Sequence, residues 1–142
     1  MASPKPPVIF VVNSSDETVD ALRNCFEDEG FNTTSMHVDE IRKGVEDIVD
    51  FVDRHVPDLV VWDVAPPYDH NWNFLRLVRK AFPELPFVVT TTNKSALDKM
   101  VGEKTETYEI LGKPYDLEQI LGAVNRALKR QRSARTASPS TV

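Results

Sequence analysis

The stretch "PDLVVWDVAPP", Pro57–Pro67, joins a continuous apolar run to an acid. The run "LVVW" lacks polar alternation, a pattern typical of a strand that is covered on both faces. Strands of this kind belong to parallel sheets, because the connecting helices pack on both sides of such sheets. Asp63 follows the run directly, and the paired prolines after Ala65 indicate a turn. The stretch therefore predicts a buried parallel strand that presents a carboxylate at its carboxyl end.

Further apolar runs alternate along the chain with segments of helical period. The other expected strands are "VIFVV" (8–12), "FNTTSM" (31–36), "PFVVT" (86–90) and "YEIL" (108–111). The expected helices carry apolar stripes at Val19, Leu22 and Phe26; at Ile41, Val45, Ile48 and Val52; at Phe74, Leu75, Val78 and Phe82; in "SALDKMV" (95–101); and at Leu117, Ile120, Leu121, Val124 and Leu128. This order predicts an α/β fold, a doubly wound (βα)5 parallel sheet with right-handed crossovers.

Length and composition limit the class of protein. The chain has 142 residues, 27% charged and 41% hydrophobic, which suits one soluble domain. We expect that domain to span residues 8–130, between disordered ends at 1–7 and 131–142, because both ends are polar or proline-rich. The start lacks the order of a secretory signal, so a cytoplasmic protein without a membrane segment is the default expectation. A net charge of −5 argues against direct nucleic-acid binding, and the single Cys25 excludes an internal disulfide.

Three side chains of different chemistry stand at the ends of the expected strands. Asp63 ends the third strand, Thr91 the fourth, and Lys113 the fifth. Each has an ordinary structural explanation by itself, such as a turn hydrogen bond or a solvated surface charge. Carboxyl ends of parallel strands meet at one edge, where ligands bind in such folds. A nucleophilic carboxylate, a hydroxyl donor and an ammonium group at one edge suit phosphoryl transfer.

These residues resemble the receiver domains of two-component response regulators. "PDLVVWDVAPP" resembles the family's third strand with its phosphoacceptor, "LPFVVTT" (85–91) the fourth strand, and "EILGKPYDLEQILGAV" (109–124) the fifth strand, Lys-Pro pair and last helix. The resemblance implies a flavodoxin-like sheet of strand order 2-1-3-4-5. It implies Asp63 as phosphoacceptor, Thr91 as switch hydroxyl, Lys113 as phosphate partner and a cis bond before Pro114. It also implies a non-enzymatic signalling role, with a histidine kinase or phosphotransfer protein as phosphate donor and a downstream protein as target.

The turn after the first expected strand departs from that family. Receivers carry adjacent acids there to hold Mg²⁺, whereas this chain has Asn13 and Ser14. Asp16 stands further on, where "SSDE" fits a capping box through Ser14 and Glu17, so we interpret Asp16 as part of a helix start. The expected Mg²⁺ site is therefore weak, formed by Asp63, the Asn13 amide oxygen and the Ala65 carbonyl.

Other departures concern signalling and access to the site. Thr92 stands where the family prefers a very small residue, and Ile110 replaces a switching aromatic. In the loop after Asp63, the three residues Tyr68, His70 and Trp72 either form a partner surface or pack over the following helix.

Three hypotheses for function remain open. The first is a stand-alone receiver that is phosphorylated on Asp63, and the second is a pseudo-receiver that binds proteins without phosphorylation. The third, a flavodoxin-like cofactor binder, is disfavoured because Asp16 and Glu17 would repel a phosphate at the first turn. For both receiver hypotheses, the resemblance implies a dimer or partner face on the helix at 95–101, the last strand and the last helix. This face should include Lys94, Lys99 and Tyr115.

Overall fold

The computed structural model describes residues 5–101 and 108–137. The strands are β1 (Val8–Asn13), β2 (Asn32–His37), β3 (Leu59–Val64), β4 (Phe87–Thr91) and β5 (Tyr108–Gly112). The helices are α1 (Asp16–Asp28), α2 (Val45–His55), α3 (Tyr68–Ala81), α4 (Lys94–Val101) and α5 (Leu117–Ala137), with a short 3₁₀ helix, η1, at Val38–Glu40. The alternation of strands and helices agrees with the expectation from the sequence.

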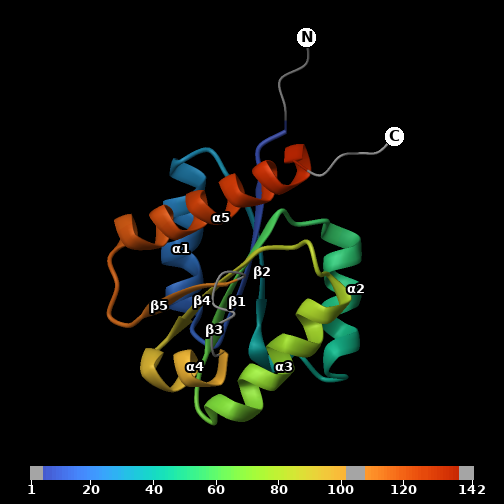
Figure 1. The fold of residues 1–142 in the computed structure, drawn as a ribbon, viewed down its shortest axis with the longest axis vertical. Helices are drawn as coiled ribbons and strands as arrows, with labels where there is room; N and C mark the ends of the chain where they lie inside the picture. The colour runs from blue at the N-terminus through green and yellow to red at the C-terminus, as the bar shows by residue number, and fades with distance from the viewer. Residues whose placement is uncertain (1–4, 102–107, 138–142) are drawn as a thin grey trace.

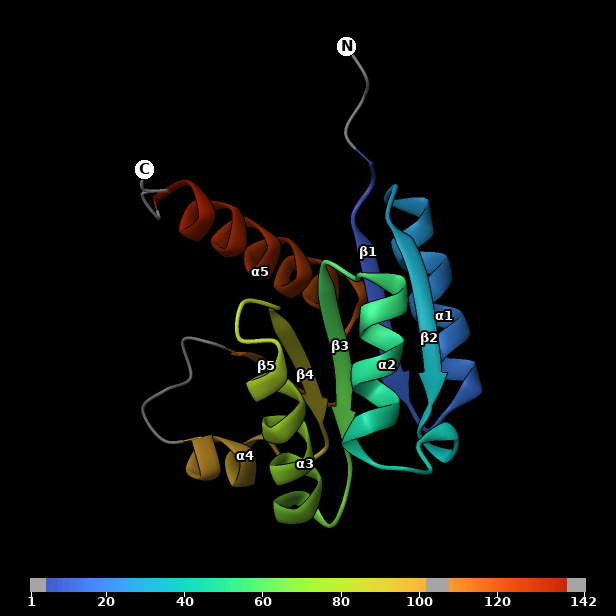
Figure 2. The same ribbon diagram turned by 90° about the vertical axis from the view of Figure 1, so that its right-hand side faces the viewer.

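All neighbouring strands run parallel, in the order β2-β1-β3-β4-β5. The predicted flavodoxin-like fold is therefore confirmed. Helices cover both faces of the sheet, with α1 and α5 on one side and α2 and α3 on the other (Figures 1 and 2). This arrangement explains the continuous apolar runs, because residues of both parities along a strand are buried.

Two apolar clusters separate the helix layers from the sheet. On one face, Val61 and Val88 belong to the same cluster as residues of α1 and α5. On the other face, Val60 and Val89 belong to the same cluster as residues of α2, α3 and α4. Successive strand residues thus point alternately to the α1/α5 face and to the α2/α3/α4 face. This alternation also decides which face each polar residue at the strand ends occupies.

Two local expectations need correction. The N-cap of α1 is Ser15, whose hydroxyl accepts a hydrogen bond from the Thr18 N–H at 3.2 Å, so the box through Ser14 and Glu17 was wrong. Ile41 lies outside α2, because Gly44 with φ of 73° separates η1 from that helix. The two segments share one apolar face, which made them resemble a single stripe.

The ends of the chain are more ordered than the sequence indicated. Helix α5 continues to Ala137, past the expected boundary at Arg130. At the other end, the Pro7 carbonyl accepts a hydrogen bond from the Asn32 N–H at 2.9 Å, which extends the contact between β1 and β2. The remaining parts of the expected disordered ends, 1–4 and 138–142, lie outside the described residues. Within the described residues, no helix has the length and hydropathy needed to cross a membrane.

Candidate phosphoacceptor site

Asp63 lies at the carboxyl edge of the sheet, on the face that α1 and α5 cover. Its position follows from strand alternation, since Asp63 stands two residues after Val61, which belongs to the cluster on that face. Thr90 pairs with Asp63 across β3 and β4 and stands two residues after Val88, so it points to the same side. Lys113 follows β5 directly and reaches back to this edge.

One oxygen of Asp63 receives two donors. The Lys113 ammonium lies 2.7 Å from Oδ1, and the Thr90 hydroxyl donates a hydrogen bond to the same Oδ1 at 2.7 Å. The side chain of Asp63 is 8% exposed, whereas that of Lys113 is 30% exposed. A buried carboxylate needs such a partner, because an isolated charge is costly to remove from water. Among the described residues, no hydrogen bond to the second oxygen, Oδ2, is found, so this oxygen is available for chemistry.

The hydroxyl that contacts Asp63 belongs to Thr90, which the sequence analysis did not select. Thr91 is fully buried and has the opposite parity, so its side chain points to the α2/α3/α4 face. Its hydroxyl oxygen accepts a hydrogen bond from the Asn93 N–H at 3.2 Å. The structure therefore brings Lys113 to Asp63 but does not bring the Thr91 hydroxyl there. Counting alternation from Asp63 and Val88 would have identified Thr90 from the sequence.

At the end of β1, where the resemblance led us to look for acids, Asn13 forms a neutral hydrogen bond. Its side chain is buried, and its Oδ1 accepts a hydrogen bond from the Ser15 N–H at 2.9 Å. This bond orients the turn that Ser15 then caps. Asp16 begins α1 and is exposed, as expected for an acid in the first turn of a helix.

The donor set offers Mg²⁺ one carboxylate and two neutral oxygens. The Ala65 carbonyl accepts a hydrogen bond from Asn71 Nδ2 at 2.7 Å, and Asn13 Oδ1 is already engaged with Ser15. Within the described part of the chain, no group of three or more His, Cys, Asp or Glu residues could hold a metal ion. Mg²⁺ prefers several anionic oxygens because it loses water reluctantly. The residues present fit a weak site only.

A cavity of about 350 Å³ opens beside Asp63. Its lining includes Ser14, Ala65 and His70 as well as Asp63. At the same edge, Tyr68 and Thr92 share a hydrogen bond of 2.7 Å between their hydroxyls, which joins the start of α3 to the β4–α4 loop. Trp72 is 2% exposed and packs edge-on to Tyr108 at 4.9 Å, so it belongs to the core rather than to a partner surface.

The segment after β5 links the acid to the last helix. The peptide bond between Lys113 and Pro114 is cis, and a second cis bond, which the sequence analysis did not anticipate, joins Pro66 to Pro67. Burial raises the pKa of the Tyr115 phenol, and the negative charge of Asp63 raises it further.

The fold and this edge of the sheet define a flavodoxin-like domain with a buried acid held by a lysine. The family model of the response regulator receiver domain matches residues 9–125. The chain therefore belongs to the receiver domain family of two-component signalling. Belonging to this family makes it a signalling domain, a class that is generally not enzymatic.

Similar proteins support the family assignment. The transcriptional regulator NtrC of Rhizobium meliloti strain 1021 is 34% identical over 50% of this chain and 15% of its own length. The response regulator MprA of Mycobacterium sp. strain KMS is 28% identical over 88% of this chain and 52% of its own length. The chain thus spans about half the length of MprA and a much smaller part of the length of NtrC.

Solved receiver structures share the fold. The receiver domain of an HD domain-containing protein from Pseudomonas fluorescens Pf-5 superposes with a TM-score of 0.74 at 19% identity, covering 96% of this chain and 97% of that one. A response regulator from Thermotoga maritima gives a TM-score of 0.69 at 25% identity, covering 87% of this chain and 98% of that one.

Proposed function

We propose that this receiver domain accepts a phosphoryl group on Asp63. The observation that carries the proposal is the 2.7 Å contact between Lys113 and Asp63 at the carboxyl edge of the sheet. Lys113 balances the carboxylate before reaction and can stay beside a phosphoryl group that is attached to it. An ammonium group in a partly desolvated site stabilises phosphoryl oxygens without reorganising at the moment of transfer.

The chemistry needs only one bond to form and one to break. Asp63 Oδ2 attacks phosphorus in line with the leaving group, and an O–P bond forms while the P–N bond of a donor phosphohistidine breaks. The imidazole of the donor leaves with the bonding electron pair and takes a proton. The donor is a histidine kinase or a phosphotransfer protein, and acetyl phosphate replaces it in the test tube. When Mg²⁺ is bound at Asp63, Asn13 and Ala65, it supplies additional positive charge.

The two neighbouring threonines take different parts in this proposal. Thr90 holds Asp63 Oδ1 and so directs Oδ2 toward the donor. The Thr91 hydroxyl, which the family resemblance suggested as the switch, points to the opposite face and bonds to the Asn93 N–H, so we assign the switch role to Thr90. If so, Thr90→Val slows phosphorylation and reduces the response of the partner face, whereas Thr91→Val changes neither.

The partner face of the proposed signal lies on α4, β5 and α5. Lys94 pairs with Asp98 at 2.8 Å on α4, and Glu109 on β5 pairs with Arg126 of α5 at 3.1 Å. A homodimer or a downstream protein binds this face, which includes Lys99 and Tyr115. We propose a cytoplasmic receiver domain that acts through protein contacts and not by binding DNA directly.

A second candidate function rests on the neutral turn after β1. With Asn13 and Ser14 in place of acids, the site binds a metal ion only weakly. A domain that cannot be phosphorylated would still present the same partner face. Beryllofluoride with Mg²⁺ separates the two functions through amide chemical shifts. Shifts around Asp63 and Thr90 in the wild type, absent from Asp63→Asn, support phosphorylation. A spectrum that stays unchanged at millimolar analogue supports an interaction module that works without phosphate.

A further inference from the structure

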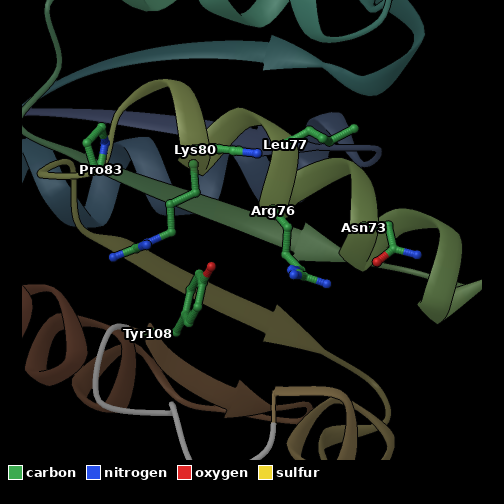
Figure 3. Close-up of a pocket in the computed structure, with 7 residues that line it drawn as sticks. Asn73, Arg76, Leu77, Lys80, Pro83 and Tyr108 are labelled. Atoms are coloured by element: carbon green, nitrogen blue, oxygen red, sulfur yellow. The ribbon is translucent and has the colours of Figure 1, made fainter.

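A second cavity lies on the opposite end of the sheet from Asp63. It has a volume of about 550 Å³ and is lined by Asn73, Arg76, Leu77, Arg79, Lys80, Pro83 and Tyr108. Most of these residues come from the second half of α3 and the loop after it, whereas Tyr108 begins β5 (Figure 3). Since Tyr108 pairs with Phe87 at the start of β4, the cavity lies toward the amino ends of these strands. It is therefore separate from the phosphoacceptor site.

Three cations of α3 converge on this cavity. Arg76, Arg79 and Lys80 stand three and four residues apart, a spacing that places them on neighbouring parts of one helical surface. Within residues 5–101 and 108–137, none of the three forms an ion pair. By contrast, Lys94, Lys113 and Arg126 each pair with an acid. The dipole of α3 favours cations such as Arg79 and Lys80 near the carboxyl end of the helix. It does not explain why these side chains line a cavity.

The side chain of Arg79 includes a buried hydrogen-bond donor that lacks an acceptor. Its guanidinium lies over the Tyr108 ring, with the Arg79 Cζ atom 5.0 Å from the ring centroid. Its Nε atom is buried and has no hydrogen-bond partner. A buried donor without an acceptor costs free energy, and native proteins leave few such groups. The Tyr108 hydroxyl end points toward α3 in Figure 3, so a donor from the strand also faces the cavity.

We propose that this cavity binds the phosphate group of a small ligand, with the Arg79 guanidinium and the side chains of Arg76 and Lys80 as donors. A guanidinium group can donate two parallel hydrogen bonds to two oxygens of one phosphate. A phosphate dianion also carries enough negative charge to balance more than one of the three cations. The volume lies within the range of small-ligand sites, so the phosphate can carry an organic group. The cluster is too small for the many phosphate contacts that nucleic-acid binding requires, and the chain has a net charge of −5.

The test is a titration of ¹⁵N-labelled protein with inorganic phosphate at constant ionic strength. All samples carry Asp63→Asn/Lys113→Gln, which removes both charges of that ion pair and so prevents phosphate from binding beside Lys113. The expected result is a saturable shift of the Arg79 Nε–Hε signal. In Arg76→Gln/Lys80→Gln we expect binding to weaken by about tenfold or more, because two charge-assisted donors are lost. The matched control Arg42→Gln/Lys129→Gln removes the same charge from exposed positions elsewhere and should bind as before.

A parallel titration with adenosine monophosphate distinguishes the sources of the phosphate. Tighter binding than inorganic phosphate, with additional shifts around Leu77 and Pro83, indicates a nucleotide, and equal binding indicates that phosphate alone is recognised. Either result supports the site. An Arg79 signal that does not move at millimolar phosphate, moves equally with chloride, or moves equally in the Arg76→Gln/Lys80→Gln variant overturns the proposal.

Discussion

The turn after β1 and the ends of β3 and β5 lie at the same edge of the sheet but are built in opposite ways. After β1, Asn13 and Ser15 join through a neutral hydrogen bond of 2.9 Å, and the turn serves the start of α1. After β3 and β5, Asp63 and Lys113 form a direct ion pair of 2.7 Å. The first region has neutral side chains at Asn13, Ser14 and Ser15, where a metal would need negative charge. The second keeps a nucleophile and a cation in contact.

The difference shows how one site can keep its reactive acid without an acidic neighbour. Where several carboxylates share a pocket, they repel each other and need a metal to balance them. Among the described residues, Asp63 contacts one cation, Lys113, and one hydroxyl, which bonds the same oxygen. We infer that positive charge for the reaction comes mainly from Lys113. The predictions below change one region at a time.

The largest effect is expected from removing the cation. Lys113→Gln should slow phosphorylation of Asp63 by acetyl phosphate by about 10²- to 10³-fold, because the donor that balances phosphoryl oxygens is lost. Lys113→Arg keeps the charge and should recover part of the rate. Rates from intact mass at several donor concentrations check this, and a Gln variant as fast as the wild type would show that Lys113 is dispensable.

Restoring acids after β1 should give the next largest effect. Asn13→Asp/Ser14→Asp should raise Mg²⁺ affinity by about tenfold or more, because two anionic oxygens join Asp63. The wild type should respond to Mg²⁺ only at millimolar concentration, followed by amide shifts near Asp63. The control Asp20→Asn removes one exposed acid of α1 outside the site. Tight binding by the wild type would mean that Asp16 reaches the ion and that its assignment to the helix start is incomplete.

The partner face should respond less to phosphorylation than the site itself. Ile110 stands where an aromatic would couple the two, so we expect beryllofluoride to change self-association or partner affinity by less than about tenfold, roughly 1.4 kcal/mol. Sedimentation velocity with and without the analogue measures this. Charge reversal at Lys94 and Lys99 should weaken the association, and the same reversal at Arg42 and Lys43 should not. A monomer that dimerises only with the analogue would contradict the prediction.

The smallest effect is expected on stability. Asp63→Asn should not stabilise the domain and should lower its free energy of unfolding by about 1 kcal/mol, because the ion pair with Lys113 is lost while the Asn oxygen still accepts from Thr90. Urea denaturation of both proteins measures the difference. A gain above about 1 kcal/mol would mean that Asp63 is repelled by nearby charge rather than held by Lys113.

The sequence predicted the fold well because burial on both faces leaves continuous apolar runs. It predicted less well where two segments share an apolar face, as at Ile41, or where neighbouring residues compete for one role. Ser14 and Ser15 both suit a helix cap, and only the chain path selects Ser15. Thr90 and Thr91 are chemically the same, and their difference is strand parity. The contact of Lys113 with Asp63 depends on how the chain leaves β5, which residue patterns alone do not specify.

The most direct test of the account is the intact mass of the protein after incubation with acetyl phosphate and Mg²⁺, followed by peptide mapping. The account predicts a gain of one phosphoryl group located on Asp63, absent from Asp63→Asn and strongly reduced in Lys113→Gln. A wild-type protein that gains no phosphoryl group under conditions that fully modify the Asn13→Asp/Ser14→Asp variant would contradict the central claim. In that case the ion pair between Lys113 and Asp63 would be structural, and the domain would work without phosphorylation.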